Sequence, residues 1–363
     1  MKTIVSFGEI MGRFSPEGFM RLRQAAPGKF DLTFGGAESN VAASIATLGG
    51  RARYVTALPK NPLADACIDS LRGLGIDTTH ILRRDGGRLG LYFCETGANQ
   101  RPSTVTYDRE NSTISLTPGS DYAWNEIFAD ARWLHLSGIT PALSATAAEA
   151  VRQAAERAKN AGLTVSLDLN FRKKLWKWDP TLGPQALAEK TARGILPFVD
   201  VIIANEEDAA DVLQIHAKDT DVHSGKVAHD RYPDVARQIA AQFPNASRIA
   251  ITLRESISAS HNNWGAMLYD VASDQASFAP WRDGEYRPFE IRNIVDRVGG
   301  GDSFAAGLIF ALTTPELSDP PTAVSFAVAA SCLAHSIVGD INFNSRSEVE
   351  ALMRGSGSGR VVR

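Results

Sequence analysis

The sequence lacks the features that mark several classes of protein. Its three cysteines, Cys67, Cys94 and Cys332, are odd in number and widely separated, so we expect neither a disulfide framework nor a cysteine metal site. The seven histidines show no metal-ligand spacing, and no apolar run approaches the length that crosses a bilayer. No Pro/Ser-rich or charge-rich linker divides the chain. We therefore expect one cytoplasmic domain over residues 1–363.

Excess charge of either sign is also missing. The formal net charge is −3, so the chain has no excess of positive charge of the kind that binds nucleic acid or an anionic membrane surface. No Gly-x-x-x-x-Gly-Lys-Ser/Thr segment occurs, so a P-loop nucleotide site is excluded. With 44% hydrophobic and 22% charged residues, the chain can bury an ordinary core. A small molecule is therefore the expected partner, without nucleic acid and without a membrane.

What the sequence does contain is a regular alternation of short apolar runs with segments of helical periodicity. This alternation predicts an α/β fold whose mostly parallel sheet is covered by helices on both faces. Polar residues follow or end the apolar runs, and in such sheets ligands bind at the carboxyl edge of the strands. We therefore expect one crevice lined by these residues, namely Asp168, Asn170, Asn205, Asp208 and Thr252.

Two segments, 12–34 and 88–112, depart from the α/β rhythm. They contain the runs 30–34, 89–93 and 104–107, whose alternation is typical of half-exposed antiparallel strands. We expect a small sheet outside the main one. Such a sheet suits a lid over the crevice, and it suits equally a dimer surface, because an isolated small sheet needs a covering partner. The two roles are compatible.

A run of three glycines opens a predicted helix in the segment Asp296-Arg-Val-Gly-Gly-Gly-Asp302-Ser-Phe-Ala-Ala-Gly307. Without Cβ atoms, the amides of Gly299, Gly300 and Gly301 can turn inward together and form an anion cradle at a helix N-terminus. Asp302 beside the cradle is a candidate base that accepts the proton of an attacking hydroxyl. The alternative is an ordinary glycine-rich turn with Asp in the first turn of a helix.

A second glycine motif, Gly35-Gly36-Ala-Glu-Ser-Asn40-Val-Ala42, also opens a predicted helix. Asn40 lies one turn into this helix and offers both a donor and an acceptor to a polyol hydroxyl. We interpret this motif as the sugar half of the site. Its alternative is a tight turn in which Asn40 contacts only its own helix.

Together the two glycine motifs resemble the two signatures of the ribokinase/PfkB carbohydrate kinases, in the family's order and at its usual separation. The resemblance covers nearly the whole chain. It implies a Rossmann-like core with a β lid that closes over the sugar, and a Mg²⁺-ATP donor. It also implies that Asp302 is the catalytic base and that the amides of Gly299, Gly300 and Gly301 stabilise the migrating charge.

Within this family the sequence is most similar to the 2-keto-3-deoxygluconate kinases. The similarity rests on the Gly-Gly-Gly-Asp form of the cradle, on Asp168-Leu-Asn170-Phe-Arg172 and on Tyr107-Asp-Arg109. It implies phosphorylation of the terminal hydroxyl to give 2-keto-3-deoxy-6-phosphogluconate, with Tyr107, Arg109 and Arg172, and more weakly Tyr92, on the substrate. The side chains agree with an acidic sugar, because guanidinium groups pair with carboxylates. For either arginine alone, a surface ion pair is the alternative.

The nucleotide side of the site is expected at Asn205, Thr252 and Arg254, although Arg254 is equally suited to covering its loop. Asp208 stands where the family's Asn-x-x-Glu motif has the longer Glu, so we expect it to reach Mg²⁺ through water. Asp296 resembles a ligand of a monovalent cation such as K⁺, and its alternative is a turn carboxylate.

Two other functions remain open on the sequence alone. A kinase of a neutral ketohexose such as fructose would leave the two arginines without a carboxylate partner. A sugar-acid-binding regulator with the same fold would have no need of the base at Asp302, and fold alone does not separate these functions. We expect a homodimer or higher oligomer built through the lid.

Overall fold

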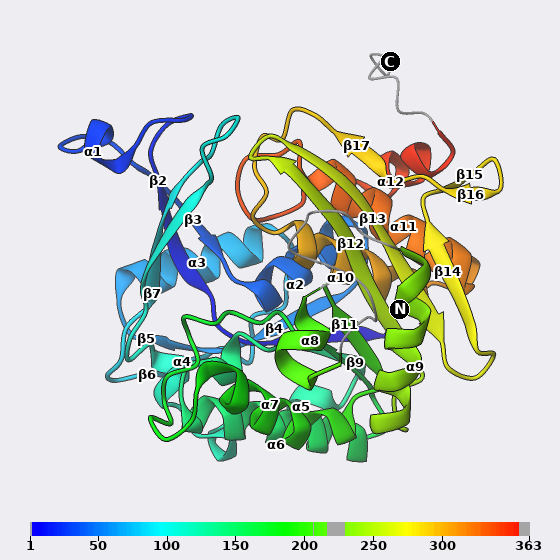
Figure 1. Ribbon diagram of the computed structural model, residues 1–363. Helices are drawn as coiled ribbons and strands as arrows, with labels where there is room; N and C mark the ends of the chain where they lie inside the picture. Colours follow the sequence, from blue (N-terminus) through cyan, green and yellow to red (C-terminus); the bar gives the residue numbers. More distant parts are fainter. Residues whose placement is uncertain (1, 206, 216–228, 356–363) are drawn as a thin grey trace.

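The computed structural model describes residues 2–205, 207–215 and 229–355 and is built on one large sheet (Figure 1). Its main path runs β14-β13-β12-β11-β10-β9-β1-β4, and β17 pairs with β13. The neighbours from β12 to β4 are parallel, while β13, β14 and β17 pair antiparallel. The strands are β1 (Thr3–Phe7), β4 (Ala52–Val55), β9 (Ala131–Ser137), β10 (Thr164–Asp168), β11 (Val201–Ala204), β12 (Arg248–Ser258), β13 (His261–Asp270), β14 (Gln275–Ala279) and β17 (Phe289–Ile291).

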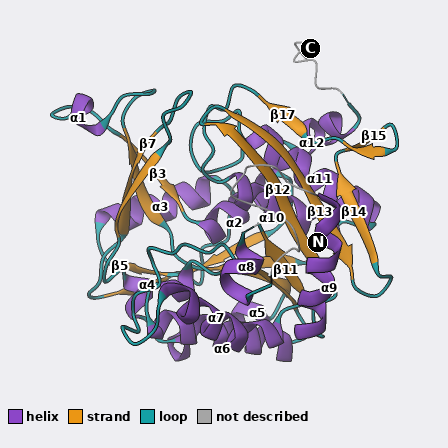
Figure 2. Cartoon of the chain, viewed as in Figure 1, coloured by secondary structure: helices purple, strands orange, loops and turns teal. Residues whose placement is uncertain are grey.

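Helices cover both faces of this sheet, and each face has its own apolar core (Figure 2). Successive strand residues alternate between the two cores, as Ile4 and Val5 do in β1. One face packs against α5 (Trp124–Phe128), α6 (Ala145–Asn160), α7 (Pro184–Ile195), α8 (Asp208–Leu213) and α9 (Tyr232–Gln242). The other packs against α2 (Ala37–Thr47), α3 (Pro62–Gly73), α10 (Gly300–Leu312), α11 (Pro320–Ala334) and α12 (Arg346–Met353). The predicted α/β class with a mostly parallel, helix-covered sheet is confirmed.

The helix that follows the three glycines, α10, is apolar on nearly all sides because it contacts both α2 and α11. Gly307 allows α11 to come close, since a Cβ atom there would lie 2.9 Å from the Cα of Ala327. In the part of the chain that the structure describes, no helix is both long enough and apolar enough to cross a membrane.

A separate four-stranded sheet, the lid sheet, projects from the core (Figure 1). Its order is β3-β2-β7-β8, with β2 (Met11–Ser15), β3 (Asp31–Gly35), β7 (Gly90–Glu95) and β8 (Thr104–Asp108). The segments 12–34 and 88–112 thus form the expected small sheet. The antiparallel pairing that the alternation indicated holds for β2 with β3 and for β7 with β8, whereas β2 and β7 pair in parallel. Each of these two strands lies in a separate segment that leaves the core, and the two segments run in the same direction.

The remaining α-helices and strands of the described residues are short. They are α1 (Leu22–Ala25), α4 (Thr113–Leu116), the paired strands β5 (Ala57–Pro59) and β6 (Leu82–Arg84), and the paired strands β15 (Trp281–Arg282) and β16 (Glu285–Tyr286).

The loop that follows α11 packs directly on the glycine run at the start of α10. Gly299 has φ +83°, and a Cβ atom there would lie 2.0 Å from the main-chain oxygen of Asp340. At Gly300 a Cβ atom would lie 3.0 Å from the His335 ring, whereas at Gly301 it would meet nothing within 4 Å. Packing therefore requires glycine at position 299, but the described structure gives no packing reason for glycine at position 301.

We predict opposite effects of alanine at these two positions on the free energy of unfolding. Gly299→Ala should lower it by roughly 1–3 kcal/mol or more, because the left-handed conformation and the close oxygen both oppose a Cβ atom. Gly301→Ala, the matched control, should leave it unchanged or raise it by up to about 1 kcal/mol, since alanine favours a helix. Urea unfolding of both variants measures this, and equal losses would contradict it.

Candidate active site

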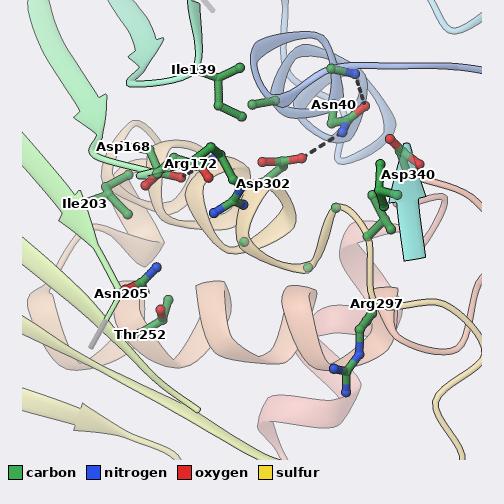
Figure 3. Close-up of a pocket in the computed structure, with 18 of the residues that line it drawn as sticks. Asn40, Ile139, Asp168, Arg172, Ile203, Asn205, Thr252, Arg297, Asp302 and Asp340 are labelled. Atoms are coloured by element: carbon green, nitrogen blue, oxygen red, sulfur yellow. Dashed lines mark hydrogen bonds between the residues drawn. The ribbon is translucent and has the colours of Figure 1, made fainter. Parts of the chain in front are cut away.

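A cavity of about 390 Å³ lies between the carboxyl edge of the main sheet, the inner face of the lid sheet and the start of α10 (Figure 3). The lining includes most residues that the sequence singled out: Gly36, Asn40, Tyr92, Tyr107, Arg109, Asp168, Asn170, Arg172, Asn205, Asp208, Thr252, Arg254, Gly299, Gly300, Gly301 and Asp302. Gly35 and Asp296 do not line it. Gly35 lies behind the wall, where a Cβ atom would be 2.3 Å from the carboxylate of Asp340.

The two glycine motifs meet at Asp302. The amide of Asn40, on α2, donates a 2.7 Å hydrogen bond from Nδ2 to Oδ2 of Asp302, in the first turn of α10 (Figure 3). The same amide accepts a 3.2 Å hydrogen bond from the main-chain N–H of Gly36 through Oδ1. Asn40 therefore orients the carboxylate of Asp302, a contact that the sequence did not indicate.

The pKa of Asp302 is raised to about 6. Burial is the main cause, the hydrogen bond from Asn40 acts in the opposite direction, and the nearby carboxylate of Asp340 adds to the rise. A carboxylate with this pKa is ionised at neutral pH, yet it is a stronger base than an ordinary aspartate. It can accept a proton from a hydroxyl group held beside it.

The chain after β10 and the start of α8 place several charged groups on one wall. Burial raises the pKa of Asp168 well above its ordinary value, and the carboxylates of Asp208 and Asp302 raise it further. Arg172 has the opposite effect on all three. Figure 3 shows this arginine between Asp168 and Asp302. The side chain of Asn170 makes a long 3.5 Å contact with Asp168. One guanidinium group thus lies among three carboxyl groups whose pKa values are all raised, and a cation bound there would favour their ionised forms.

Asp208 is held by main-chain amides. Its two oxygens accept hydrogen bonds of 3.0 Å from Phe171 N and 3.1 Å from Asn205 N. The side chain of Asn205 in turn accepts from the main-chain N–H groups of Glu207 and Asp208. Among the described residues, no cluster of three His, Cys, Asp or Glu side chains is placed to hold a metal ion. Both oxygens of Asp208 therefore already have main-chain donors.

The inner face of the lid sheet brings Tyr92, Tyr107 and Arg109 to the cavity. The Arg109 guanidinium lies 5.2 Å from the ring centroid of Tyr107. It is buried, and its Nη2 donates to the carboxylate of Glu9. The arginine proposed for a substrate carboxylate therefore already has an acidic partner. The sequence analysis missed Glu9, although it follows β1 at the same edge of the sheet as Asp168 and the strand-end rule could have found it.

Asp296 is buried outside the cavity wall and forms an ion pair with Arg13, whose Nη2 lies 2.5 Å from its Oδ2. It also accepts hydrogen bonds from the main-chain N–H groups of Val298, at 3.1 Å, and Gly339, at 3.2 Å. The guanidinium already supplies a positive charge to this carboxylate. The structure therefore gives no support to a monovalent cation at Asp296.

Two further cavity residues were missed by the sequence analysis. Asp340, in the loop after α11, accepts hydrogen bonds from Arg13 and from the hydroxyl of Tyr92. Arg297 lines the end of the cavity near Thr252 and Arg254 and donates from Nη2 to Asn262 Oδ1 at 3.0 Å. Burial lowers the pKa of Arg297, and the charge of Arg254 lowers it further. This end of the cavity is basic and suits an anionic ligand.

Comparisons with known proteins agree on a family. The model of the pfkB family carbohydrate kinases matches residues 1–240. A 2-dehydro-3-deoxygalactonokinase of Haloferax volcanii is 30% identical over 98% of this chain and 98% of its own length. The crystal structure of a 2-dehydro-3-deoxygluconokinase of Thermotoga maritima superposes with a TM-score of 0.87 at 42% identity, covering 98% of both chains. The chain therefore belongs to the pfkB family of carbohydrate kinases, ATP-dependent phosphotransferases with an alcohol group as acceptor, and has their ribokinase-like fold.

Proposed function

We propose that this sugar kinase phosphorylates the terminal hydroxyl of 2-keto-3-deoxygluconate, also called 2-dehydro-3-deoxygluconate, and forms 2-keto-3-deoxy-6-phosphogluconate. The proposal rests mainly on the position of Asp302. Asn40, from the glycine motif at the start of α2, orients its carboxylate, and Asp302 directly follows the three glycines in the chain. The names of the similar proteins from Haloferax volcanii and Thermotoga maritima support a 2-keto-3-deoxy sugar acid. These two names differ in the sugar, so the galactonate epimer belongs in the test.

In the proposed reaction, Asp302 accepts the proton of the sugar hydroxyl while that oxygen attacks the γ-phosphorus of ATP. The new O–P bond forms as the bond to the β-phosphate oxygen breaks, and ADP leaves. The N–H groups of Gly299, Gly300 and Gly301 at the start of α10 are proposed to stabilise the charge on the transferred group. The N–H of Gly300 has only a long 3.5 Å hydrogen bond to the main-chain oxygen of Arg297 to give up for this role. Asn205, Thr252, Arg254 and Gly301 are proposed to bind the nucleotide.

Mg²⁺ fits the same site. The excess of carboxylates around Arg172 favours a cation, and Asp208, whose oxygens already accept two amides, is proposed to contact it through water. Bound with ATP, the ion would neutralise phosphate charge. A role for K⁺ at Asp296 stays a prediction, which assays in potassium and in sodium salts check directly.

For the sugar, we propose contacts from Gly36 at the start of α2, from Asn40, Tyr92 and Tyr107, and from the segment of Asp168, Asn170 and Arg172. Gly35, which lies behind the cavity wall, is not among them. Arg109 and Arg172 are the candidate partners of a substrate carboxylate. One observation favours a second candidate function, a kinase of a neutral ketohexose such as fructose. Glu9 already compensates the charge of Arg109, and this leaves Arg172 as the more available guanidinium.

The lid sheet also supports a proposed homodimer or higher oligomer. The register places Leu32, Phe14 and Phe93 in one row on the face opposite to Arg13 and Tyr92. Phe14 stacks on Phe93, and Leu32 is 40% exposed. This outer apolar face is the surface that we propose to be covered by a second copy.

The proposal places the enzyme in the cytoplasm. Its three cysteines are free thiols in the structure, as a reducing compartment requires. Burial raises the pKa of Cys67 and Cys332 to about 12 and that of Cys94 to about 11. All three thiols are therefore protonated at neutral pH.

The first prediction concerns the base. Coupled ADP detection with Mg²⁺-ATP and a panel of sugar acids and hexoses should show turnover of 2-keto-3-deoxygluconate. Asp302→Asn keeps size but removes basicity, so kcat should fall at least about 100-fold with little change in ATP affinity. Near-normal turnover of this variant would refute the role of Asp302, and wild-type activity on fructose alone would favour the neutral-sugar kinase.

The same residue sets the expected pH dependence. Because its pKa is raised to about 6, Asp302 becomes protonated and inactive as the pH falls through that value. The kcat of the wild-type enzyme should rise about tenfold per pH unit below pH 6 and level off above it. A flat profile between pH 5 and pH 7 would contradict the assignment.

The second prediction tests recognition of the substrate carboxylate. Arg172→Leu should weaken transition-state binding of the sugar acid by about 1.5–3 kcal/mol and affect a neutral hexose less. Arg109→Leu is best made together with Glu9→Gln, since the single change would strand a buried carboxylate. Arg88→Leu is the control, because Arg88 pairs with Asp108 and does not line the cavity. Equal losses on acidic and neutral sugars would make the arginines scaffold residues.

The third prediction concerns the oligomer. Leu32→Asp should convert the proposed dimer to monomers, because a charge on the outer face of the lid sheet opposes burial of that face. Leu116→Asp is the matched control, since Leu116 is 52% exposed and lies in α4 outside the lid sheet. Analytical ultracentrifugation of the wild type and of both variants gives the result. A monomeric wild type would rule out the dimer.

A further inference from the structure

The lid sheet and the anion cradle are joined by a buried cluster of charged groups. Arg13 on β2 is 2% exposed and contacts two carboxylates, Asp296 just before the glycine run and Asp340 in the loop after α11. Its Nε also donates a 2.9 Å hydrogen bond to the hydroxyl of Ser15. Tyr92 on β7 donates to the second oxygen of Asp340. The lid strands β2 and β7 thus contact the segment just before the cradle and the loop after α11 that packs on it.

An apolar contact accompanies the ion pairs. Val298, the residue immediately before Gly299, packs against a small cluster on the inner face of the lid sheet formed by Met11, Tyr92 and Cys94. Val105 on β8 packs against the same cluster. The residue that leads into the cradle therefore touches the lid sheet directly, and Arg13 fixes the carboxylate two residues earlier.

Asp296 and Asp340, the two partners of Arg13, contact the cradle in different ways. Asp296 accepts the main-chain N–H groups of Val298 and Gly339, so its position controls the backbone on either side of the cradle. The main-chain oxygen of Asp340 would lie 2.0 Å from a Cβ atom at Gly299, so the loop after α11 packs directly against the cradle. Because the ion pairs are buried, displacing the lid sheet from the cradle would break charged contacts out of reach of water.

We propose that Arg13 is a positioning residue that couples the lid sheet to the anion cradle, so that sugar binding under the lid improves binding of ATP at the cradle, and the reverse. The inference rests on the proposed use of the cradle for ATP and of the lid face for the sugar. Arg13 touches neither ligand in this scheme. It acts through Asp296 and Asp340, and the coupling is reciprocal by thermodynamic linkage.

A purely structural role for Arg13 predicts something different. If the cluster only holds the fold together, its loss lowers stability and weakens both ligands independently, without changing the effect of one ligand on the other. The decisive quantity is therefore the ratio of two dissociation constants of the sugar, measured without and with a saturating non-hydrolysable ATP analogue and Mg²⁺. Isothermal titration calorimetry gives both constants for each protein.

The experiment uses the full-length protein and the sugar that the substrate panel identifies, whether acidic or neutral. For the wild type we expect the analogue to tighten sugar binding at least about 5-fold. Arg13→Met should reduce the ratio to less than about 2-fold. Arg21→Met is the matched control, because Arg21 leads into α1 between two lid strands and pairs with Glu95 away from the cradle. This control should keep the wild-type ratio.

A second variant keeps the test decisive if Arg13→Met fails to fold. Asp296→Asn leaves Arg13 paired with Asp340 alone, so the buried cluster becomes electrically balanced and its volume is unchanged. It should also reduce the ratio to less than about 2-fold. Hydrogen exchange adds an independent readout, since sugar alone should slow exchange in residues 296–301 of the wild type but not of this variant.

The outcomes are separable from those of the proposed function. A folded Asp296→Asn protein that keeps the wild-type ratio overturns the coupling role, and so does a wild-type ratio near one. Wild-type turnover of the panel sugars reports on the proposed function by itself. Kinase activity with an unchanged ratio in the variants would leave the proposed function standing and remove Arg13 from it.

Discussion

The close packing of two helix starts at one edge of the sheet determines most of the candidate site. Both α2 and α10 begin at a glycine that another loop approaches closely: a Cβ atom at Gly36 would lie 2.0 Å from the oxygen of Glu9, and one at Gly299 equally close to that of Asp340. The two helices also contact each other. Four distant parts of the chain are therefore brought around one cavity, and the hydrogen bond between Asn40 and Asp302 follows from that arrangement.

The electrostatics of the cavity follow from how each carboxylate is compensated. Glu9 and Asp340 receive arginines, and Asp208 receives two main-chain amides. At all three of Asp208, Asp340 and Asp302, burial outweighs these partners and raises the pKa. For Asp302 the opposing contacts are the hydrogen bond from Asn40 and the charge of Arg172. Glu38, on the same helix as Asn40, shows a similar balance, because hydroxyl donors only partly offset the burial that raises its pKa to about 7. Burial thus makes several carboxylates in and around the cavity more basic than ordinary carboxylates, with or without a charged partner.

The sequence predicted the features that depend on local patterns. The alternation of apolar runs with helical segments indicated a mostly parallel sheet covered by helices, although it did not mark the short edge strands β4, β14 and β17. The rule that ligands bind at strand ends predicted that Asp168, Asn205 and Thr252 share one crevice, and all three line the cavity. The two glycine motifs indicated where α2 and α10 begin. For the lid sheet, alternation predicted β3, β7 and β8 but named no run for β2. It also did not predict the parallel pairing of β2 with β7, because the direction of pairing depends on how the intervening chain returns through the core.

Contacts between residues far apart in the sequence could not be predicted from local patterns. Arg13 meets Asp340 across 327 positions and Asp296 across 283 positions, and no local pattern marks a buried guanidinium in a half-exposed strand. Asp340 stands in an irregular loop without a repeat or strand to signal it. The pairing of Arg109 with Glu9 could not be inferred either, since residue type alone made this arginine look available to a ligand.

The state of the three native thiols makes the protein suited to site-specific labelling. Thiol reagents react with the thiolate, and burial keeps Cys67, Cys94 and Cys332 protonated near neutral pH. A cysteine introduced at an exposed lid position outside the proposed dimer face, for example at Lys29 just before β3, would therefore be modified far faster than the native ones. A fluorophore or spin label attached there would report the position of the lid relative to the core in solution, without prior removal of the native cysteines.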